Sequence, residues 1–133
     1  MKSTFAVVAM SPAVAQRQAD SAQLAAALTA GRTALLRLFD AYRTALGAAL
    51  RVPFSSELNL PLWELGHLGW FEEHWIARNA FRAHGAAVDV EAMLAAQPAS
   101  SLSAADQLYD SSRVPHASRW QLPLPDAART VDY

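Results

Sequence analysis

The chain has 133 residues, of which 53% are hydrophobic and 17% are charged, and its formal net charge is −1. This composition can bury the core of one small domain and argues against a disordered chain. The absence of cysteine excludes disulfides, thiolate metal sites and iron–sulfur clusters, so any metal must be held by His, Asp, Glu or water. Lysine and arginine form no long run, and we therefore expect no nucleic-acid partner.

Residues 1–19 are expected to form a flexible tail. The apolar run Phe5–Met10 is shorter than the core of a typical secretory signal. No stretch approaches 18 consecutive apolar residues, so we expect no membrane span. The sequence thus favours a cytoplasmic protein.

The first long helix is expected over residues 20–50. Asp20 or Ser21 can cap its N-terminus. Apolar residues then recur at spacings of three and four, which places them in one stripe along the helix. The stripe consists of Leu24, Leu28, Leu35, Phe39, Tyr42, Leu46 and Leu50.

A second long helix is expected to begin at Pro61, where the missing proline N–H is not needed. Asn59 is its expected cap, and the helix is expected to run to about Ala83, with Gly85 as its C-terminal stop. A heptad-like spacing puts two histidines and three large aromatic residues on one face, which we expect to face the core. These residues are Trp63, His67, Trp70, His74 and Phe81. The other aromatic residues of this helix, Phe71 and Trp75, are also expected to lie in the core.

Short helices are expected after the second long helix. Asp89 can cap one that runs through Ala96. Ser103 and Asp106 have the spacing of a capping box for another, which should end near Asp110.

A long irregular loop is expected over residues 111–125, which contain three prolines, and a last helix should begin at Asp126. Residues 20–133 therefore predict an all-α fold of two long helices, short helices and a long loop. Two apolar stripes alone leave faces uncovered, so we expect a partial helical bundle, truncated before its last long helices.

His67 is the residue best suited to bind a metal. A histidine directed into a bundle core can ligate a metal through a ring nitrogen. Gly66 and Gly69 flank it, and each glycine costs a helix roughly 1 kcal/mol relative to alanine. Their presence indicates that another group approaches the helix closely. A core histidine hydrogen-bonded to a neighbour is the alternative interpretation.

Other ionisable residues near His67 have simpler expected roles. Glu64 and His67 form one Glu-x-x-His pair, whereas a di-iron carboxylate site needs two such pairs. His74 lies roughly 10 Å further along the helix, so we expect it to pack or hydrogen-bond rather than share an ion with His67. Glu72 and Glu73 are expected to be surface charges, and Arg78 is spaced to pair with either.

The loop carries Arg113, His116 and Arg119. Loops at the mouths of bundles often bind ligands, and arginine presents a planar fork to carboxylates. Ordinary surface charge is the alternative interpretation of all three residues.

Residues Leu60–Asn79, with the sequence LPLWELGHLGWFEEHWIARN, resemble the second-helix signature of the DinB-like domain in the sulfoxide synthases of ergothioneine biosynthesis (the EgtB family) and the related selenoneine synthases. Residues Leu108–Val114 and Leu122–Pro125 are similar to the connection that follows in that family. The resemblance extends over roughly residues 20–133.

The resemblance implies a four-helix DinB-like bundle that supplies three histidines to one iron(II), completed by a C-terminal domain similar to the formylglycine-generating enzyme. Such oxidoreductases activate oxygen and join a thiol or selenol to the imidazole carbon of hercynine. His67 matches the first iron ligand. The other two belong to a paired-histidine motif that nothing here matches, so we expect this chain alone to bind Fe(II) weakly and to be inactive.

The resemblance also bears on the loop. Some family members bind the carboxylate of the sulfur substrate through arginines there, which implies Arg119 and Arg113 as substrate-binding residues. His116 stands near where some relatives carry arginine, so the sulfur or selenium donor stays open. Two further hypotheses are a stand-alone DinB-like, metal-dependent thiol transferase and a non-catalytic helical module that self-associates through its uncovered apolar faces.

Overall fold

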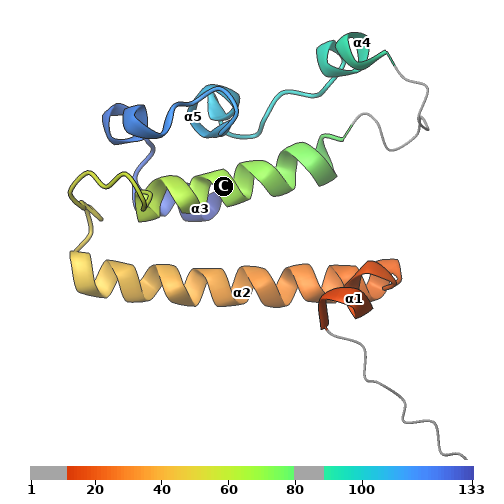
Figure 1. The fold of residues 1–133 in the computed structure, drawn as a ribbon, viewed down its shortest axis with the longest axis horizontal. Coiled ribbons are helices and arrows are strands. Elements are labelled where there is room, and N and C mark those ends of the chain that lie inside the picture. The colour runs from red at the N-terminus through yellow and green to blue at the C-terminus, as the bar shows by residue number, and fades with distance from the viewer. Residues whose placement is uncertain (1–11, 80–88) are drawn as a thin grey trace, which may run out of the picture. The chain divides into compact units, whose positions relative to one another are not determined.

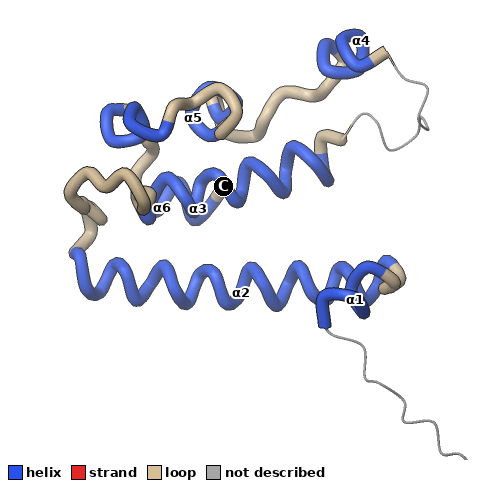
Figure 2. Tube along the Cα trace, in the orientation of Figure 1, coloured by secondary structure: helices blue, strands red, loops and turns tan. Residues whose placement is uncertain are grey.

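The computed structural model describes residues 12–79 and 89–133. Every regular element in these two ranges is a helix, which confirms the all-α prediction (Figure 2). Within the same ranges, no helix combines the length and apolar character that crossing a membrane requires. The chain divides into two units, residues 1–37 and 38–133, and the boundary falls within the second helix.

The first unit contains α1 (Pro12–Arg17) and the first part of α2 (Ser21–Leu46) (Figure 1). Residues 12–17, which the sequence places in an N-terminal tail, are helical, and residues 1–11 lie outside the described part of the chain. The predicted cap at Asp20 is confirmed. Its carboxylate accepts from the Gln23 backbone N–H at 2.8 Å, while the Gln23 side chain accepts from the Asp20 N–H at 2.9 Å. This reciprocal pair is a capping box.

The second unit begins within α2, which ends at Leu46 rather than at the expected Leu50. Gly47 follows with a φ of +78°, the left-handed conformation in which glycine commonly ends helices. Phe39 and Leu50 are both buried.

The second long helix is α3 (Pro61–Glu72), continued by the π-helical segment η1 (Glu73–Ala77). The predicted cap at Asn59 is wrong, because Leu60 is the cap residue and makes no side-chain hydrogen bond. In η1 the Arg78 backbone N–H donates to the Glu73 carbonyl at 2.8 Å, five residues back. The rest of the expected helix, together with Phe81, Ala83 and Gly85, lies outside the described residues.

Two later helices begin where the sequence predicts them to begin. Asp89 caps α4 (Val90–Ala95), and Asp126 caps α6 (Ala127–Asp132), each by accepting from a backbone N–H three residues on. A short 3₁₀ helix, η3 (His116–Gln121), lies within the segment predicted to be irregular.

The helix α5 (Ala105–Tyr109) begins without the predicted capping box. Its cap position is Ala104, which has a left-handed φ of 63° and offers no side-chain oxygen. Asp106 instead accepts hydrogen bonds from Trp70 of α3 and from Arg78, the residue after η1. The capping-box interpretation of Ser103 and Asp106 is therefore wrong.

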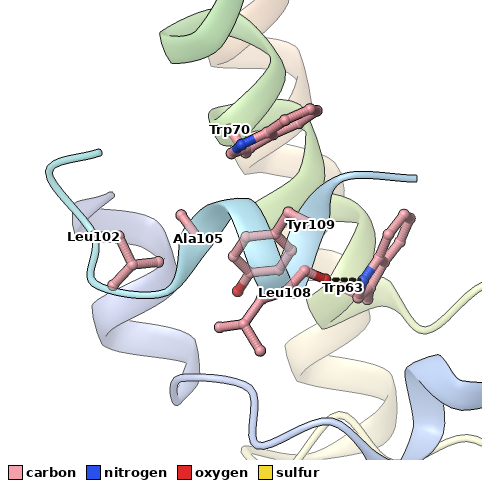
Figure 3. Close-up of a cluster of buried hydrophobic side chains, with 6 residues drawn as sticks. All are labelled: Trp63, Trp70, Leu102, Ala105, Leu108 and Tyr109. Atoms are coloured by element: carbon pink, nitrogen blue, oxygen red, sulfur yellow. Dashed lines mark hydrogen bonds between the residues drawn. The ribbon is translucent and has the colours of Figure 1, made fainter. Parts of the chain in front are cut away.

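The core of the second unit lies where α3 packs against α5 and α6. In Figure 3 two indoles from α3 lie against side chains of the 102–109 segment. The cluster consists of Trp63, Trp70, Leu102, Ala105, Leu108 and Tyr109. The expected core role is thus confirmed for Trp63 and Trp70. It is wrong for Phe71 and Trp75, whose side chains are 50% and 49% exposed.

Candidate metal-ligand site

His67 lies on α3 between the two buried indoles. Its ring stacks on Trp63 with the centroids 4.7 Å apart and the planes 12° apart. On its other side, Trp70 lies 5.9 Å away at an interplanar angle of 21°. Residues three and four apart are neighbours on one helix face, so the Trp-x-x-x-His-x-x-Trp spacing itself produces this stack. The stack fixes the plane of the imidazole.

The Nδ1 atom of His67 lies 2.8 Å from the backbone oxygen of Tyr109, at the end of α5. A carbonyl oxygen only accepts, so Nδ1 must carry the hydrogen and donate it. In the neutral ring this leaves the lone pair on Nε2, which makes no hydrogen bond with any residue of the described ranges. Metal-binding histidines typically have this arrangement, in which the second nitrogen donates to a carbonyl or carboxylate.

Gly66 accounts for part of the close approach that the sequence indicated. A Cβ atom at this position would lie less than 3.0 Å from the Cζ, Cε1 and Oη atoms of Tyr109. The Tyr109 ring thus occupies the space that any larger residue would need. Gly69, on the other side of His67, is also buried.

Arg119 joins the same aromatic stack from the loop. It is only 8% exposed, and its Cζ atom lies 3.8 Å from the centroid of a Trp63 ring. Its Nη1 donates to the Asn59 side chain at 2.7 Å, and Asn59 in turn donates to Glu64. Burial lowers the pKa of the Arg119 guanidinium, and the charge of Glu64 opposes that shift. Arg119 is therefore connected to His67 through Trp63.

The other two loop residues make their contacts elsewhere. Arg113 has a side chain that is 79% exposed, and it pairs with Asp110 at 3.3 Å. His116 lies 3.2 Å from the Leu58 carbonyl through Nε2 and packs edge-on against Phe54 and Trp120. The structure thus brings together His67 and Arg119, through Trp63, but neither Arg113 nor His116 contacts them within the described ranges.

His74 has the contacts expected of a packing residue. Its ring lies 4.8 Å from that of Trp70, and its Nδ1 is 3.4 Å from the side-chain nitrogen of Gln97. The face predicted from the heptad spacing therefore continues from Trp63 to His74 as an alternation of indole and imidazole rings.

An ion-pair network centred on the buried Arg78 lies beyond Trp70. Arg78 is 7% exposed and binds Asp106 through two hydrogen bonds, each of 2.9 Å. Its Nε donates to the Pro98 carbonyl at 2.6 Å, and Glu73 lies 3.7 Å from its Nη1. The predicted pairing of Arg78 with a nearby glutamate is confirmed, but its main partner, Asp106, was missed because nothing in the local sequence connects residues 28 positions apart.

Glu73 is not the surface charge that the sequence predicted. Its carboxylate accepts hydrogen bonds from the Ser100 hydroxyl at 2.5 Å, the Tyr133 hydroxyl at 2.7 Å and the Ser101 backbone N–H at 2.8 Å. These bonds attach the 100–101 segment and the last residue to the end of α3. The charge of Glu73 is satisfied by partners that are distant in sequence, which explains why local pattern suggested a solvated acid.

The two carboxylates of this network have lowered pKa values. The hydrogen bond from Arg78 holds the pKa of Asp106 below its ordinary 3.8, against an opposing effect of burial. Burial by itself raises the pKa of Glu73, but the hydrogen bonds from Ser100, Ser101 and Tyr133 together outweigh it and lower the pKa from 4.5.

Acid is therefore expected to destabilise the second unit. A carboxyl whose pKa is lower in the folded chain contributes stability above its unfolded-state pKa, and this is lost as the pH falls through the folded-state pKa. The urea midpoint should be level from neutral pH to about 5 and should fall below about 4.5. In the Glu73→Gln variant the fall should be shallower. A wild-type midpoint that stays level to about pH 3 would contradict this assignment.

The described ranges contain no group of three or more His, Asp or Glu residues placed to hold a metal together. Comparison of the chain with protein-family models and with curated proteins found no match.

Proposed function

We propose that this chain is the N-terminal, DinB-like part of an iron(II)- and oxygen-dependent enzyme that joins a thiol or selenol to hercynine. The observation that carries the proposal is the state of His67. Its Nδ1 is hydrogen-bonded to the Tyr109 carbonyl, so in the neutral ring the free lone pair is on Nε2. The resemblance of residues 60–79 to the second helix of the sulfoxide synthases supports the same assignment.

In this proposal His67 supplies one neutral imidazole ligand, a donor that suits iron(II). Tyr109 sets which nitrogen binds, and the indoles of Trp63 and Trp70 hold the plane of the ring. The donor set of the described residues fits the metal in kind but provides one ligand of the three. The proposal takes the remaining two from a paired-histidine motif outside the described residues. Bound iron(II) would supply the activation of oxygen.

Arg119 and Arg113 have different roles in this proposal. Arg119 is buried over Trp63 and uses Nη1 to bind Asn59, so it supports the stack rather than a ligand. Arg113 has a side chain that is 79% exposed, and among the described residues its carboxylate partner is Asp110. It is therefore the arginine that a substrate carboxylate could reach by exchanging with Asp110.

Iron(II) added without oxygen is expected to broaden the NMR signals of the His67 ring before those of His74, because the lone pair of His67 is held ready by the Tyr109 carbonyl. A His67→Ala variant should lose this response, while His74→Ala should keep it. In the complete gene product, His67→Ala should abolish product formation from hercynine and a thiol or selenol donor. Iron that affects both rings equally, or neither, would argue against the proposal.

A second candidate, a helical module that self-associates, is favoured by the exposed apolar side chains of α3 and η1. Leu68, Phe71, Trp75 and Ile76 are between 39% and 51% exposed. The same samples decide between the two functions when their mass is measured by light scattering. A tight dimer that ignores iron and keeps its stability in the His67→Ala variant would favour the module.

A further inference from the structure

The Tyr109 ring contacts α3 at Gly66, directly beside the candidate ligand. Gly66 has an ordinary helical conformation, so its backbone alone does not require glycine. The requirement comes from outside the helix, because a Cβ atom would overlap Cζ, Cε1 and Oη of the Tyr109 ring. That ring is fully buried and stacks on Tyr133 with centroids 6.3 Å apart, which leaves it little room to withdraw.

The end of α5 faces α3 with two backbone carbonyls. The last carbonyls of a helix have no partner within it and must be satisfied from outside. Leu108 O accepts from the Trp63 indole at 2.8 Å, and Tyr109 O accepts from His67 Nδ1, also at 2.8 Å. Trp63 and His67 are one helical turn apart, so two successive carbonyls of α5 bind two successive side chains of one α3 face.

Gly66 lies directly before His67, at the place where the tyrosine ring meets α3. The ring and the carbonyl belong to the same residue, so the depth at which the ring seats also sets the position of the carbonyl. A side chain at position 66 would push α5 outward and lengthen the bond between Tyr109 O and His67 Nδ1. Without that acceptor, the proton is free to move to Nε2, the nitrogen that a metal needs unprotonated.

We infer that Gly66 and Tyr109 are positioning residues for His67: the tyrosine ring seats in the space left by the glycine, and its carbonyl thereby holds the imidazole with the proton on Nδ1 and the lone pair on Nε2. The tautomer follows from the contacts of this chain alone. Its use as a metal ligand rests on the proposed function.

The tautomer is measured by nitrogen-15 NMR of the full chain at a pH where the histidines are neutral. Wild-type His67 is expected to show a protonated Nδ1 and an unprotonated Nε2. Gly66→Ala should shift His67 toward the opposite tautomer and weaken the response to iron(II) by roughly 10- to 100-fold. Gly31→Ala is the matched control, because a Cβ atom at Gly31 meets nothing within 4 Å. It should leave both readouts unchanged.

A pair of double variants separates positioning from general loss of folding. In Gly66→Ala/Tyr109→Leu the three overlapping ring atoms are absent, while the carbonyl of residue 109 remains. This variant should recover the wild-type tautomer. In Gly66→Ala/Tyr109→Phe only Oη is removed, and Cζ and Cε1 still overlap, so it should resemble Gly66→Ala.

The outcomes distinguish this inference from the proposed function. The positioning role would be overturned if the wild-type His67 were protonated on Nε2. It would also be overturned if the Gly66→Ala variant kept the wild-type tautomer and iron response, and in that case the metal proposal would survive. A tautomer that responds as expected, in a chain whose His67 signals ignore iron(II), would retain the positioning role and count against the proposed function.

Discussion

Replacing Trp63 with alanine is expected to lower the free energy of unfolding by about 3–5 kcal/mol, the usual range for a large aromatic residue removed from a core. The Trp63 side chain is 1% exposed and bonds the Leu108 carbonyl, as the dashed line in Figure 3 shows. It also contacts the His67 ring and the Arg119 guanidinium on its faces. The change therefore leaves a cavity, an unsatisfied carbonyl and a buried cation without its aromatic contact. Urea denaturation followed by far-ultraviolet circular dichroism measures the loss.

Trp75→Ala is the matched control for this prediction. The same residue type is removed from the next turns of the same helical segment, but its side chain is 49% exposed. Its loss should be clearly smaller, because much of its surface stays in water in the folded chain. Equal losses for the two variants would mean that Trp63 is not part of the core.

Replacing Arg78 with methionine is expected to cost about 2–3 kcal/mol. Removing one partner of a fully buried ion pair costs about 3–5 kcal/mol, because the other charge stays behind unpaired. Here the Arg78 side chain is buried, but Asp106 is 43% exposed and water can partly solvate it. The expected loss of stability is therefore smaller than that for a fully buried ion pair. Methionine keeps much of the aliphatic stem, so the loss reports mainly on the guanidinium and its bonds to Asp106 and Pro98.

Two further variants test the origin of this effect. Arg43→Met removes an exposed arginine, whose partner Asp40 is also exposed, and should cost no more than about 1 kcal/mol. Adding Asp106→Asn to Arg78→Met should cost less than the sum of the two single changes, since each alone leaves the other charge without its partner. Strict additivity would show that the two residues act independently.

The helix starts that could be predicted from the sequence are those that a local rule decides. Asp20, Asp89 and Asp126 each cap a helix by accepting from a backbone N–H three residues away, so the residues that decide the outcome are close together in the chain. The two wrong caps show the limit of that rule. The Asn59 side chain is hydrogen-bonded to Glu64 and to Arg119, which is sixty residues away. The Asp106 carboxylate is hydrogen-bonded to Arg78. Distant partners that form charge-assisted bonds displaced the local ones.

In the candidate site, too, the local contacts could be predicted from the sequence and the distant ones could not. Helical spacing placed His67 between Trp63 and Trp70, and the flanking glycines indicated a close neighbour. The neighbour itself, Tyr109, could not be identified, because its contribution to His67 is a backbone carbonyl, a group that every residue possesses. The exposure of Phe71 and Trp75 was likewise missed, since an aromatic residue carries no local signal of which helix face will be covered.

The π-helical segment η1 has a consequence for how this helix tolerates changes in length. One residue of an α-helix corresponds to a rotation of about 100°. The extra residue in the bond from Arg78 N–H to the Glu73 carbonyl therefore alters the direction in which everything after it points. If these residues formed a regular α-helix of unchanged length, Arg78 would turn away from Asp106, whereas deleting one residue between Glu73 and Ala77 would restore α-helical pairing and keep Arg78 on nearly the same side of the helix. The π-helical turn thus sets the direction of Arg78, so that it reaches Asp106 while Trp63, His67 and Trp70 stay on their own face of α3.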